Sequence, residues 1–525
     1  MSAGRHVVVV GGGLAGITAA IALREAGDQV TLLEARPRLG GATCSFTRNG
    51  LVIDNGQHVF LGCCSAYRGL LDRLDMTGEV SVQDRFDVTV LRPGGQARLR
   101  RTRLPGPLHM GLALARYSFL SPAERLRVPR AALAMMRLDP ARPGLDHERL
   151  GDWLAARGQG EHARRVLWDL FTVSALNVAG DDASMTLAAT VVQTALLGKK
   201  DAADIGTPAI SLGDLHGKAG ARLLQRLGAD VRMGAKVAAV EAAAGGGFLV
   251  RLTDRALPAD SGPFPPHENA AADPRPTAGD EAASSQIHPD GPLAGRDGRA
   301  GGAEIHADGV VLAVPPDAAA RLIPAGPADG GAGSAGPGSA GPGWPGPGPD
   351  RWRDLGASPI VNVHVIYDRK VTELPFAAAV DSPVQWVFDR TRPSGLPSGQ
   401  YLAISLSAAD DLVDVTTARL REQFVPALAE LFPAARDAQI TDFFVTRERR
   451  ATFRQVPGCA GLRPGAATAV GGLVLAGAWT DTGWPDTMEG AVRSGLNAAR
   501  ELRRGLPAAL PPAGRRTDVV AGATT

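Results

Sequence analysis

The chain has 525 residues, of which 44% are hydrophobic, and a formal net charge of +2 at pH 7. This length is enough for a large core in two intertwined domains, and the nearly balanced charge argues against nucleic acid as the main partner. Four cysteines, Cys44, Cys63, Cys64 and Cys459, are too few and too irregularly spaced for a disulfide framework or a zinc site. We therefore expect small buried cysteine side chains and no bound metal.

The start of the chain predicts its compartment. No signal peptide precedes the first predicted strand, and no uncharged apolar run is long enough to span a bilayer. We expect a cytoplasmic protein, with peripheral attachment to the inner face of the cell membrane left open.

Residues 6–41 have the pattern of a dinucleotide-binding unit. A β-branched run predicts a buried parallel strand over residues 6–10, and an Ala/Leu/Ile-rich run predicts a helix over residues 14–26. The turn between them has G-x-G-x-x-G spacing, which allows a tight turn, close approach of a pyrophosphate and close packing of helix on strand. The residues assigned to this turn and to the helix N-terminus are Gly11, Gly13, Leu14, Ala15 and Gly16.

A second strand over residues 29–33 ends in an acidic residue, Glu34. A carboxylate at this position accepts a ribose hydroxyl in dinucleotide folds. A second glycine turn follows beside two arginines, which suits a longer cofactor whose second half passes close to the backbone. The alternative is that the arginines are solvated at the surface, but it leaves the glycines unexplained. The residues of this second set are Ala35, Arg36, Arg38, Gly40, Gly41 and Ala42.

This order of elements resembles the FAD-binding N-terminus of the amine oxidase and phytoene desaturase flavoprotein superfamily. The resemblance implies an α/β fold, in which a Rossmann-like FAD-binding domain is interleaved with a substrate-binding domain of mixed sheet plus a helical cap. It also implies FAD as the cofactor.

Two short strands, over residues 42–46 and 51–54, lead into the sequence DNGQHVFLG. Polar groups packed around a glycine directly before an apolar segment suggest a ligand contact, and a plain hairpin loop is the alternative. We assign Asn55, Gly56, Gln57 and His58 to the cofactor site.

From Arg98 to Arg137, nine arginines alternate with leucines, methionines and aromatic residues, and Glu124 is the only acid. This mixture fits a helical cap that rests on an anionic membrane surface. An ordinary helical subdomain with solvated arginines fits equally well. Apolar helices predicted over residues 162–175 and 186–197 belong either to the core or to a lipid tunnel.

Residues 230–240 predict one strand, and the resemblance implies that backbone near Val237 meets the adenine. Strands predicted over residues 248–252 and 304–313 continue this part. Residues 360–368 predict a strand of the substrate-domain sheet, on which His364 faces either the substrate or, as we expect for a single histidine, the solvent.

The C-terminal segment is similar to the terminal FAD motif of the same superfamily. A strand over residues 473–476 precedes a loop whose acid, Asp481, is expected to bind a ribityl or phosphate oxygen. A helix start at residues 489–492 is expected to aim its amides at the pyrimidine side of the flavin. The residues assigned here are Gly477, Asp481, Met488, Gly490, Ala491 and Val492.

These elements divide the chain into flavin-binding segments, substrate-domain segments and Pro/Gly-rich stretches that we expect to be disordered. The flavin-binding segments are residues 1–75, 212–322 and 466–505, the substrate-domain segments are 76–211 and 351–465, and the disordered stretches are 254–302, 323–350 and 506–525.

Within the superfamily, residues 53–64, IDNGQHVFLGCC, are most similar to the squalene-associated branch, the hydroxysqualene dehydroxylases. This resemblance implies reductive removal of the hydroxyl of hydroxysqualene to give squalene for hopanoid and triterpenoid synthesis, with squalene-pathway enzymes as partners. Loss of the hydroxyl as water needs a proton, and His58 is the candidate donor. The alternatives are a carotenoid or other polyprene desaturase, an amine oxidase, and a flavin-free lipid-binding protein.

Overall fold

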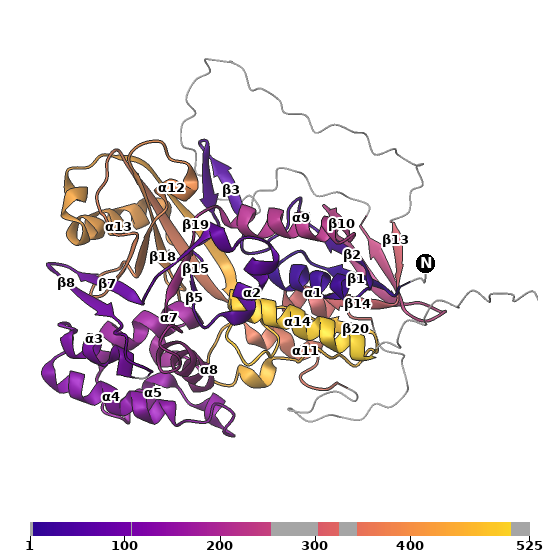
Figure 1. Ribbon diagram of the computed structural model, residues 1–525, viewed down its shortest axis with the longest axis horizontal. Helices are drawn as coiled ribbons and strands as arrows, with labels where there is room; N and C mark the ends of the chain where they lie inside the picture. Colours follow the sequence, from indigo (N-terminus) through magenta and orange to yellow (C-terminus); the bar gives the residue numbers. More distant parts are fainter. Residues whose placement is uncertain (1–3, 107, 254–302, 325–343, 506–525) are drawn as a thin grey trace, which may run out of the picture.

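The computed structural model describes residues 4–106, 108–253, 303–324 and 344–505 (Figure 1). The insertion at 254–302, most of the loop at 323–350 and the tail at 506–525 lie outside the described residues. The C-terminal end of that loop is ordered, which corrects the expectation of disorder there. It leads into α11 (Pro349–Trp352), and Trp344 packs edge-on against Trp352 with ring centroids 5.7 Å apart.

A five-stranded parallel sheet carries the predicted dinucleotide-binding unit. Its strands come from the beginning, the middle and the end of the chain, in the order β10 (Asp230–Met233), β2 (Gln29–Glu34), β1 (His6–Val10), β14 (Gly309–Leu312) and β20 (Leu473–Leu475). The valines of β1 are buried on both faces, as expected for a central parallel strand. The predicted strands at both ends of the chain are confirmed.

The first and last helices of the described chain, α1 (Leu14–Glu25) and α14 (Met488–Gly505), pack side by side against this sheet (Figure 1). Their contact is close at Gly495, where a Cβ atom would lie 2.3 Å from the carbonyl oxygen of Ala15. The first and last described helices therefore lie in close contact, since only a glycine at position 495 lets the two backbones approach this far. Helices α2 (Ser65–Arg73) and α9 (Ala219–Arg226) flank the pair.

The strand predicted over residues 230–240 is two strands in different sheets, so this prediction is wrong. Gly234 has a φ of +73° and ends β10, and β11 (Val237–Ala242) then pairs with β12 (Phe248–Leu252). The chain turns there because glycine tolerates a left-handed conformation that would not continue a strand. β13 (Glu304–Ala307) completes this smaller sheet.

A seven-stranded sheet forms the core of the substrate domain. Its order is β19 (Ile440–Thr452), β15 (Ser358–Tyr367), β18 (Gln400–Leu406), β17 (Trp386–Asp389), β16 (Phe376–Ala379), β7 (Asp87–Arg92) and β8 (Gly95–Arg100), and α13 (Thr417–Leu431) packs beside it. His364 on β15 is fully buried, hydrogen-bonds Tyr401 and Thr446 and stacks on Phe444. The expectation that it faces solvent is therefore wrong.

The helical cap lies at the edge of the molecule away from the parallel sheet (Figure 1). Its helices are α3 (Gly111–Arg116), α4 (Pro122–Met136), α5 (Leu150–Ala155), α6 (Glu161–Ala163), α7 (Asp169–Leu176) and α8 (Met185–Val191), with π-helical turns at Arg164–Trp168 and Val192–Leu196. The cap begins later than predicted, because Arg98 and Arg100 lie on β8 and pair with Asp87. Arg101 is buried in an ion pair with Asp204.

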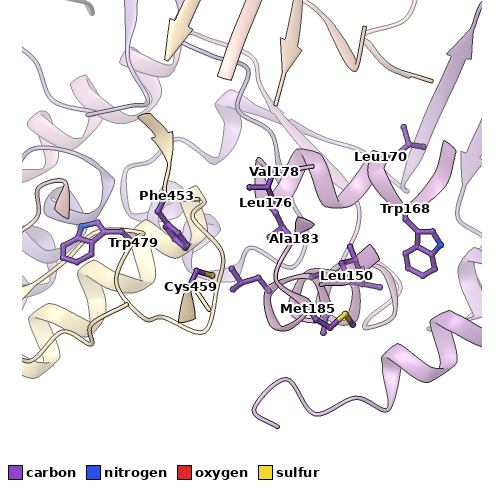
Figure 2. Packing of buried hydrophobic residues seen from close by; sticks show 14 of the residues in the cluster. Leu150, Trp168, Leu170, Leu176, Val178, Ala183, Met185, Phe453, Cys459 and Trp479 are labelled. Carbon is purple, nitrogen blue, oxygen red and sulfur yellow. The ribbon is translucent and has the colours of Figure 1, made fainter. Parts of the chain in front are cut away.

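The most buried residues of the apolar face that we predicted for the cap helices belong to the hydrophobic core. Trp168 and Leu170 are less than a tenth exposed, whereas Phe171 and Ala175 are half-buried. Figure 2 shows Leu176 in one hydrophobic cluster with Phe453, Cys459 and Trp479 of the C-terminal part. This cluster fixes the cap to the rest of the protein.

Short elements complete the fold. A hairpin joins β3 (Ser45–Arg48) and β4 (Leu51–Asp54) through Asn49 and Gly50, both at positive φ, as a tight two-residue turn requires. β5 (Phe60–Leu61), β9 (Ile205–Pro208) and β6 (Val80–Val82) form a third small sheet, and α10 (Pro316–Leu322) and α12 (Thr391–Ser394) are short helices.

Candidate functional site

The first glycine turn leaves open space in front of α1. Gly11 has a φ of +107° and a Cβ there would lie 2.3 Å from the carbonyl oxygen of Ala313, so neither its conformation nor its surroundings admit a side chain. Gly13 caps α1 without a side-chain hydrogen bond, and a Cβ there would meet only Gly41, at 3.8 Å. The free amides at the start of α1, at Leu14, Ala15 and Gly16, thus face a space that suits a phosphate.

The second glycine turn lies directly against the first. The amide of Gly40 donates to the carbonyl of Gly12 at 2.8 Å, and a Cβ on Gly41 would lie 2.9 Å from the Cα of Gly13. Both residues have positive φ. Sequence reasoning placed both turns at one ligand, and the structure brings them together.

Glu34 joins these turns through its carboxylate. Oε2 accepts a hydrogen bond from the amide of Gly12 at 2.6 Å, and Oε1 accepts one from the amide of Arg36 at 2.8 Å. Each carboxylate oxygen has further lone pairs for a hydroxyl donor. Ala35 is half-buried beside it.

The two arginines after Glu34 differ in their surroundings. Arg36 is exposed, which agrees with the alternative that the arginines are solvated at the surface. Ala42 is exposed as well. Arg38 is half-buried, donates to the sulfur of Cys44 at 3.2 Å, and has a buried Nε without a partner among the described residues.

Val237 lies near the same end of β2. The amide of Ala235 donates to the carbonyl of Glu34, and the amide of Gly234 donates to that of Arg36, each at 2.9 Å. Val237, the first residue of β11, therefore lies two residues after Ala235, whose amide is bonded to the backbone of Glu34.

The segment from Asn55 to His58 sits between the parallel sheet's glycine turns and the seven-stranded sheet. Asn55 Nδ2 donates to the carbonyl of Ala42 at 3.3 Å, and the carbonyl of Asn55 accepts from Asn362 Nδ2 at 3.3 Å. Gly56 is buried between His58 and Asn362, each within 3.6 Å of where its Cβ would lie. Asn362 was not among the predicted site residues, although its strand was.

Several buried polar atoms here have no hydrogen-bond partner among the described residues. They are Arg38 Nε, Asn55 Oδ1, Gln57 Nε2 and Asn362 Oδ1. A buried polar atom without a partner is costly, so a cluster of them indicates a ligand that offers both donors and acceptors. A flavin dinucleotide has this character, and the residues present fit it.

His58 is half-buried, and its Nδ1 lies 3.2 Å from the carbonyl oxygen of Gly56. Desolvation lowers the pKa of His58, while the Gly56 carbonyl and the charge of Asp54 oppose the shift. Asp54 is itself held by the guanidinium of Arg390 at 2.5 Å in a buried ion pair. A neutral His58 that donates from Nδ1 to Gly56 leaves Nε2 as a hydrogen-bond acceptor.

The C-terminal motif corrects the expectation for the start of the helix, while the role of Asp481 stays a prediction. Asp481 is exposed and its carboxylate accepts from the amide of Gly483 at 3.1 Å. The amides of Gly490 and Ala491 are already bonded to Thr487, at 3.2 and 2.9 Å. The free donors at the start of α14 are therefore those of its first two residues, Met488 and Glu489, rather than residues 489–492 as a set.

Two further assigned residues of this motif have structural contacts. Gly477 has a φ of +143°, and its amide donates to Ser494 Oγ at 2.8 Å. Val492 is 1% exposed and packs in the core beside α1.

A family model described as flavin containing amine oxidoreductase matches residues 14–261 and 293–503. The chain belongs to this flavin-containing amine oxidoreductase family. One relative is a hydroxysqualene dehydroxylase from Rhodopseudomonas palustris, 29% identical over 94% of this chain and 97% of the relative. A zeta-carotene desaturase from Zea mays is 23% identical over 93% and 82%.

The solved structure of cyclohexylamine oxidase from Brevibacterium oxydans has the same fold, with a TM-score of 0.63 and 18% identity over 95% of this chain and 99% of that one. The α/β fold is therefore confirmed. Membership of the family makes the chain an FAD-dependent oxidoreductase, which confirms the cofactor and the enzyme class implied by the resemblance of its sequence to the flavoprotein superfamily. Among the described helices, none is both long and apolar enough to cross a bilayer.

Sequence reasoning missed a buried arginine beneath the C-terminal loop of this flavoenzyme. Arg463 is 4% exposed and donates to the carbonyls of Ala478, Trp479 and Thr480 at 3.0, 3.3 and 2.6 Å. Its guanidinium also lies 5.0 Å from the ring centroid of Phe453. It ties the first part of the loop between β20 and α14 to the segment before β20, and its sequence context gave no signal of this.

The carboxylate of Glu489 is a second unpredicted link. It is buried and accepts from the amides of Ala66 and Tyr67, at 3.1 and 2.7 Å, and from Arg493 at 2.7 Å. A negative charge at the N-terminus of α2 is stabilised by the helix dipole. Glu489 thus ties the start of α14 to the start of α2.

Proposed function

We propose that this flavoenzyme reductively removes the hydroxyl group of hydroxysqualene and forms squalene. The observation that carries the proposal is the similarity to a hydroxysqualene dehydroxylase over nearly the whole length of both chains. The segment from Ile53 to Cys64, which resembles that branch, lies where the unpartnered polar atoms gather.

The residues proposed to hold FAD come from both ends of the chain. The amides after Gly13 are suited to the pyrophosphate, Glu34 to a ribose hydroxyl, and the backbone near Val237 to the adenine. The free amides at the start of α14 and the unpartnered groups of Asn55 and Gln57 are left for the rest of the cofactor. When bound and reduced, the flavin supplies a hydride.

The proposed reaction breaks a C–O bond at an allylic carbon. The leaving hydroxyl takes a proton and departs as water, and the carbon receives the hydride. His58 is the proposed proton donor, and it must be doubly protonated to donate from Nε2 while Nδ1 remains bonded to Gly56. Burial of the site keeps water from the developing cation.

The substrate class favours a place at a membrane. A polyprene is far more soluble in lipid than in water, so we propose that the enzyme works at the inner face of the cell membrane. Enzymes that make hydroxysqualene and consume squalene are its proposed neighbours in hopanoid and triterpenoid synthesis.

A carotenoid desaturase is the second candidate, favoured by the similarity to a zeta-carotene desaturase. In that reaction the substrate would lose hydride and the flavin would be reduced.

The test is anaerobic incubation of FAD-loaded protein with candidate polyprenes. Flavin reduced beforehand should be reoxidised by hydroxysqualene, with squalene detected by mass spectrometry. Oxidised flavin that is instead bleached by phytoene or zeta-carotene would establish the desaturase, and no response to any of the three would reject both.

A further inference from the structure

Exposed apolar side chains concentrate in one part of the chain, in the first two helices of the cap and the segment directly before them. Among the described residues, ten large hydrophobic side chains are exposed, and six of them fall between residues 104 and 136. They are Leu104, Leu108, Leu112, Leu126, Leu133 and Met136. Single exposed leucines are ordinary, but a cluster of this kind marks a surface that is covered in use.

The buried and the exposed apolar residues of α4 lie on opposite faces of the helix. Val128, Ala131 and Met135 are buried against the cap, while Leu126 and Leu133, seven positions apart, point to the opposite side and are 75% and 42% exposed. Ser121 and Glu124 form a capping box at the start of the helix. The helix is therefore well formed, and Leu126 and Leu133 form a second apolar stripe that is exposed in the described chain.

Unpaired arginines accompany these side chains. Arg103, Arg116, Arg127, Arg130 and Arg137 are exposed and have no ion-pair partner among the described residues. The carboxylate of Glu124 is already engaged by the amide of Ser121 and by His162. No free carboxylate of residues 104–137 therefore neutralises the five guanidinium groups.

The other arginines of the cap are used internally. Arg101 pairs with Asp204, and Arg125 donates to the carbonyls of Tyr117 and Leu120 at 3.1 and 3.0 Å. Arg101 and Arg125 are thus bonded within the protein, whereas the five exposed arginines are not in ion pairs among the described residues.

We propose that this surface, called here the cap face and made of those six apolar side chains and five arginines, docks on a lipid bilayer that contains anionic lipids. Leucine and methionine side chains enter the boundary between headgroups and acyl chains, and guanidinium groups bind lipid phosphates. α3 and α4 lie at the outer edge of the molecule, away from the parallel sheet (Figure 1).

A protein partner is the competing occupant. Protein interfaces combine an apolar centre with a polar rim of mixed character. The cap face instead combines apolar and cationic groups of one sign, which matches the composition of an anionic bilayer surface.

The test is flotation of the FAD-loaded full chain with vesicles of phosphatidylcholine alone or with added phosphatidylglycerol, at low and high salt. We expect binding to the anionic vesicles that falls as salt increases. The variant R127Q/R130Q should lower the partition coefficient by about tenfold or more, because each basic residue contributes about 1 kcal/mol. The variant L126S/L133S should bind weakly to both vesicles.

The matched control is R226Q/M233S, which changes an exposed arginine and an exposed methionine on α9 and β10, outside the cap face. It should bind as the natural protein does, and flavin absorbance should report an intact fold in every variant. Absence of binding to anionic vesicles, or equal loss in the control, would overturn the proposal. Because the vesicles contain no polyprene, the result is independent of the proposed reaction.

Discussion

Glu34 accepts a hydrogen bond from the amide of Gly12, with 2.6 Å between Oε2 and the nitrogen. The other carboxylate oxygen accepts from the amide of Arg36. The acid that ends β2 therefore fixes the first glycine turn in addition to its proposed role as the acceptor of a ribose hydroxyl. Gly12 is buried, so removal of the carboxylate would leave its N–H without a partner.

Glu34→Ala is expected to lower the free energy of unfolding of the FAD-free protein by about 1–3 kcal/mol. FAD binding should weaken by about tenfold or more, since the proposed charged acceptor of the ribose is lost as well. Glu34→Gln keeps one acceptor oxygen, so its free energy of unfolding and its affinity for FAD should lie between those of Glu34→Ala and those of the natural protein. Urea unfolding measures the first effect and titration of FAD fluorescence the second; an unchanged dissociation constant in Glu34→Ala would exclude a ribose contact.

Arg463→Met is expected to release the loop of residues 478–480 from its three hydrogen bonds. Buried carbonyls without donors should lower the free energy of unfolding by about 2–4 kcal/mol and increase the rate at which FAD dissociates. Arg463→Lys supplies fewer donors and should restore only part of the loss. Flavin retention after gel filtration and thermal unfolding are the measurements.

The control for Arg463 is Arg454→Gln, which breaks a partly exposed ion pair with Asp410. Pairs of this kind contribute up to about 1 kcal/mol, so flavin retention should not change. Equal behaviour of the two variants would mean that Arg463 does not position the loop.

Gly495→Ala and Gly69→Ala test the contact between the two ends of the chain. A Cβ at Gly495 would lie 2.3 Å from the carbonyl oxygen of Ala15, whereas one at Gly69, in the middle of α2, meets nothing within 4 Å. We expect Gly495→Ala to destabilise the protein by about 1–3 kcal/mol through overpacking. Gly69→Ala should stabilise it by up to about 1 kcal/mol. Urea unfolding of both variants checks the opposite signs.

The parts of this site that follow from the sequence are local in the chain. The spacing of Gly11, Gly13 and Gly16 predicts the turn because the motif lies within one strand–turn–helix unit, where a Cβ at Gly16 would lie 1.8 Å from the carbonyl oxygen of Gly11. Asn362 and Arg463 could not be assigned in this way, because their partners lie hundreds of residues away or on a loop whose path the sequence leaves open. The break at Gly234 could have been predicted from the sequence, because a glycine inside a predicted strand is a known signal of a break.

His364 shows a different limit. The alternation of residues along β15 correctly separated its two faces, but alternation does not tell whether the second face is covered. β15 is an inner strand with β18 and β19 on its sides, and nearly all of its residues are buried. Burial of the second face is a property of the assembled sheet and of Phe444 on the neighbouring strand.

Burial of His364 predicts a loss of stability in acid. Desolvation lowers its pKa in the folded protein to about 3, against about 6.5 in an unfolded chain. Below pH 6.5 the unfolded chain binds a proton that the folded protein does not, so the free energy of unfolding falls as pH falls, by up to about 1.4 kcal/mol per pH unit. Urea unfolding at pH 7 and pH 5 should show this decrease.

His364→Gln should be less stable at pH 7 but lose less stability between pH 7 and pH 5 than the natural protein does. His306→Gln removes an exposed histidine and is the control, with an expected slope equal to that of the natural protein. An unchanged slope in His364→Gln would mean that another group causes the acid sensitivity.

If His58 donates the proton in the proposed reaction, the rate depends on its doubly protonated form. Desolvation lowers its pKa below 6.5, so this form is a minority at neutral pH and the single-turnover rate should fall as pH rises, approaching tenfold per pH unit. The rate of His58→Gln, measured per bound flavin, should be low and show no such dependence. Stopped-flow reoxidation of reduced flavin by hydroxysqualene between pH 5.5 and 8.5 measures both profiles. A natural protein whose rate is constant over this range, or a His58→Gln variant with the same slope, would exclude His58 as the donor and leave it a role in binding the cofactor.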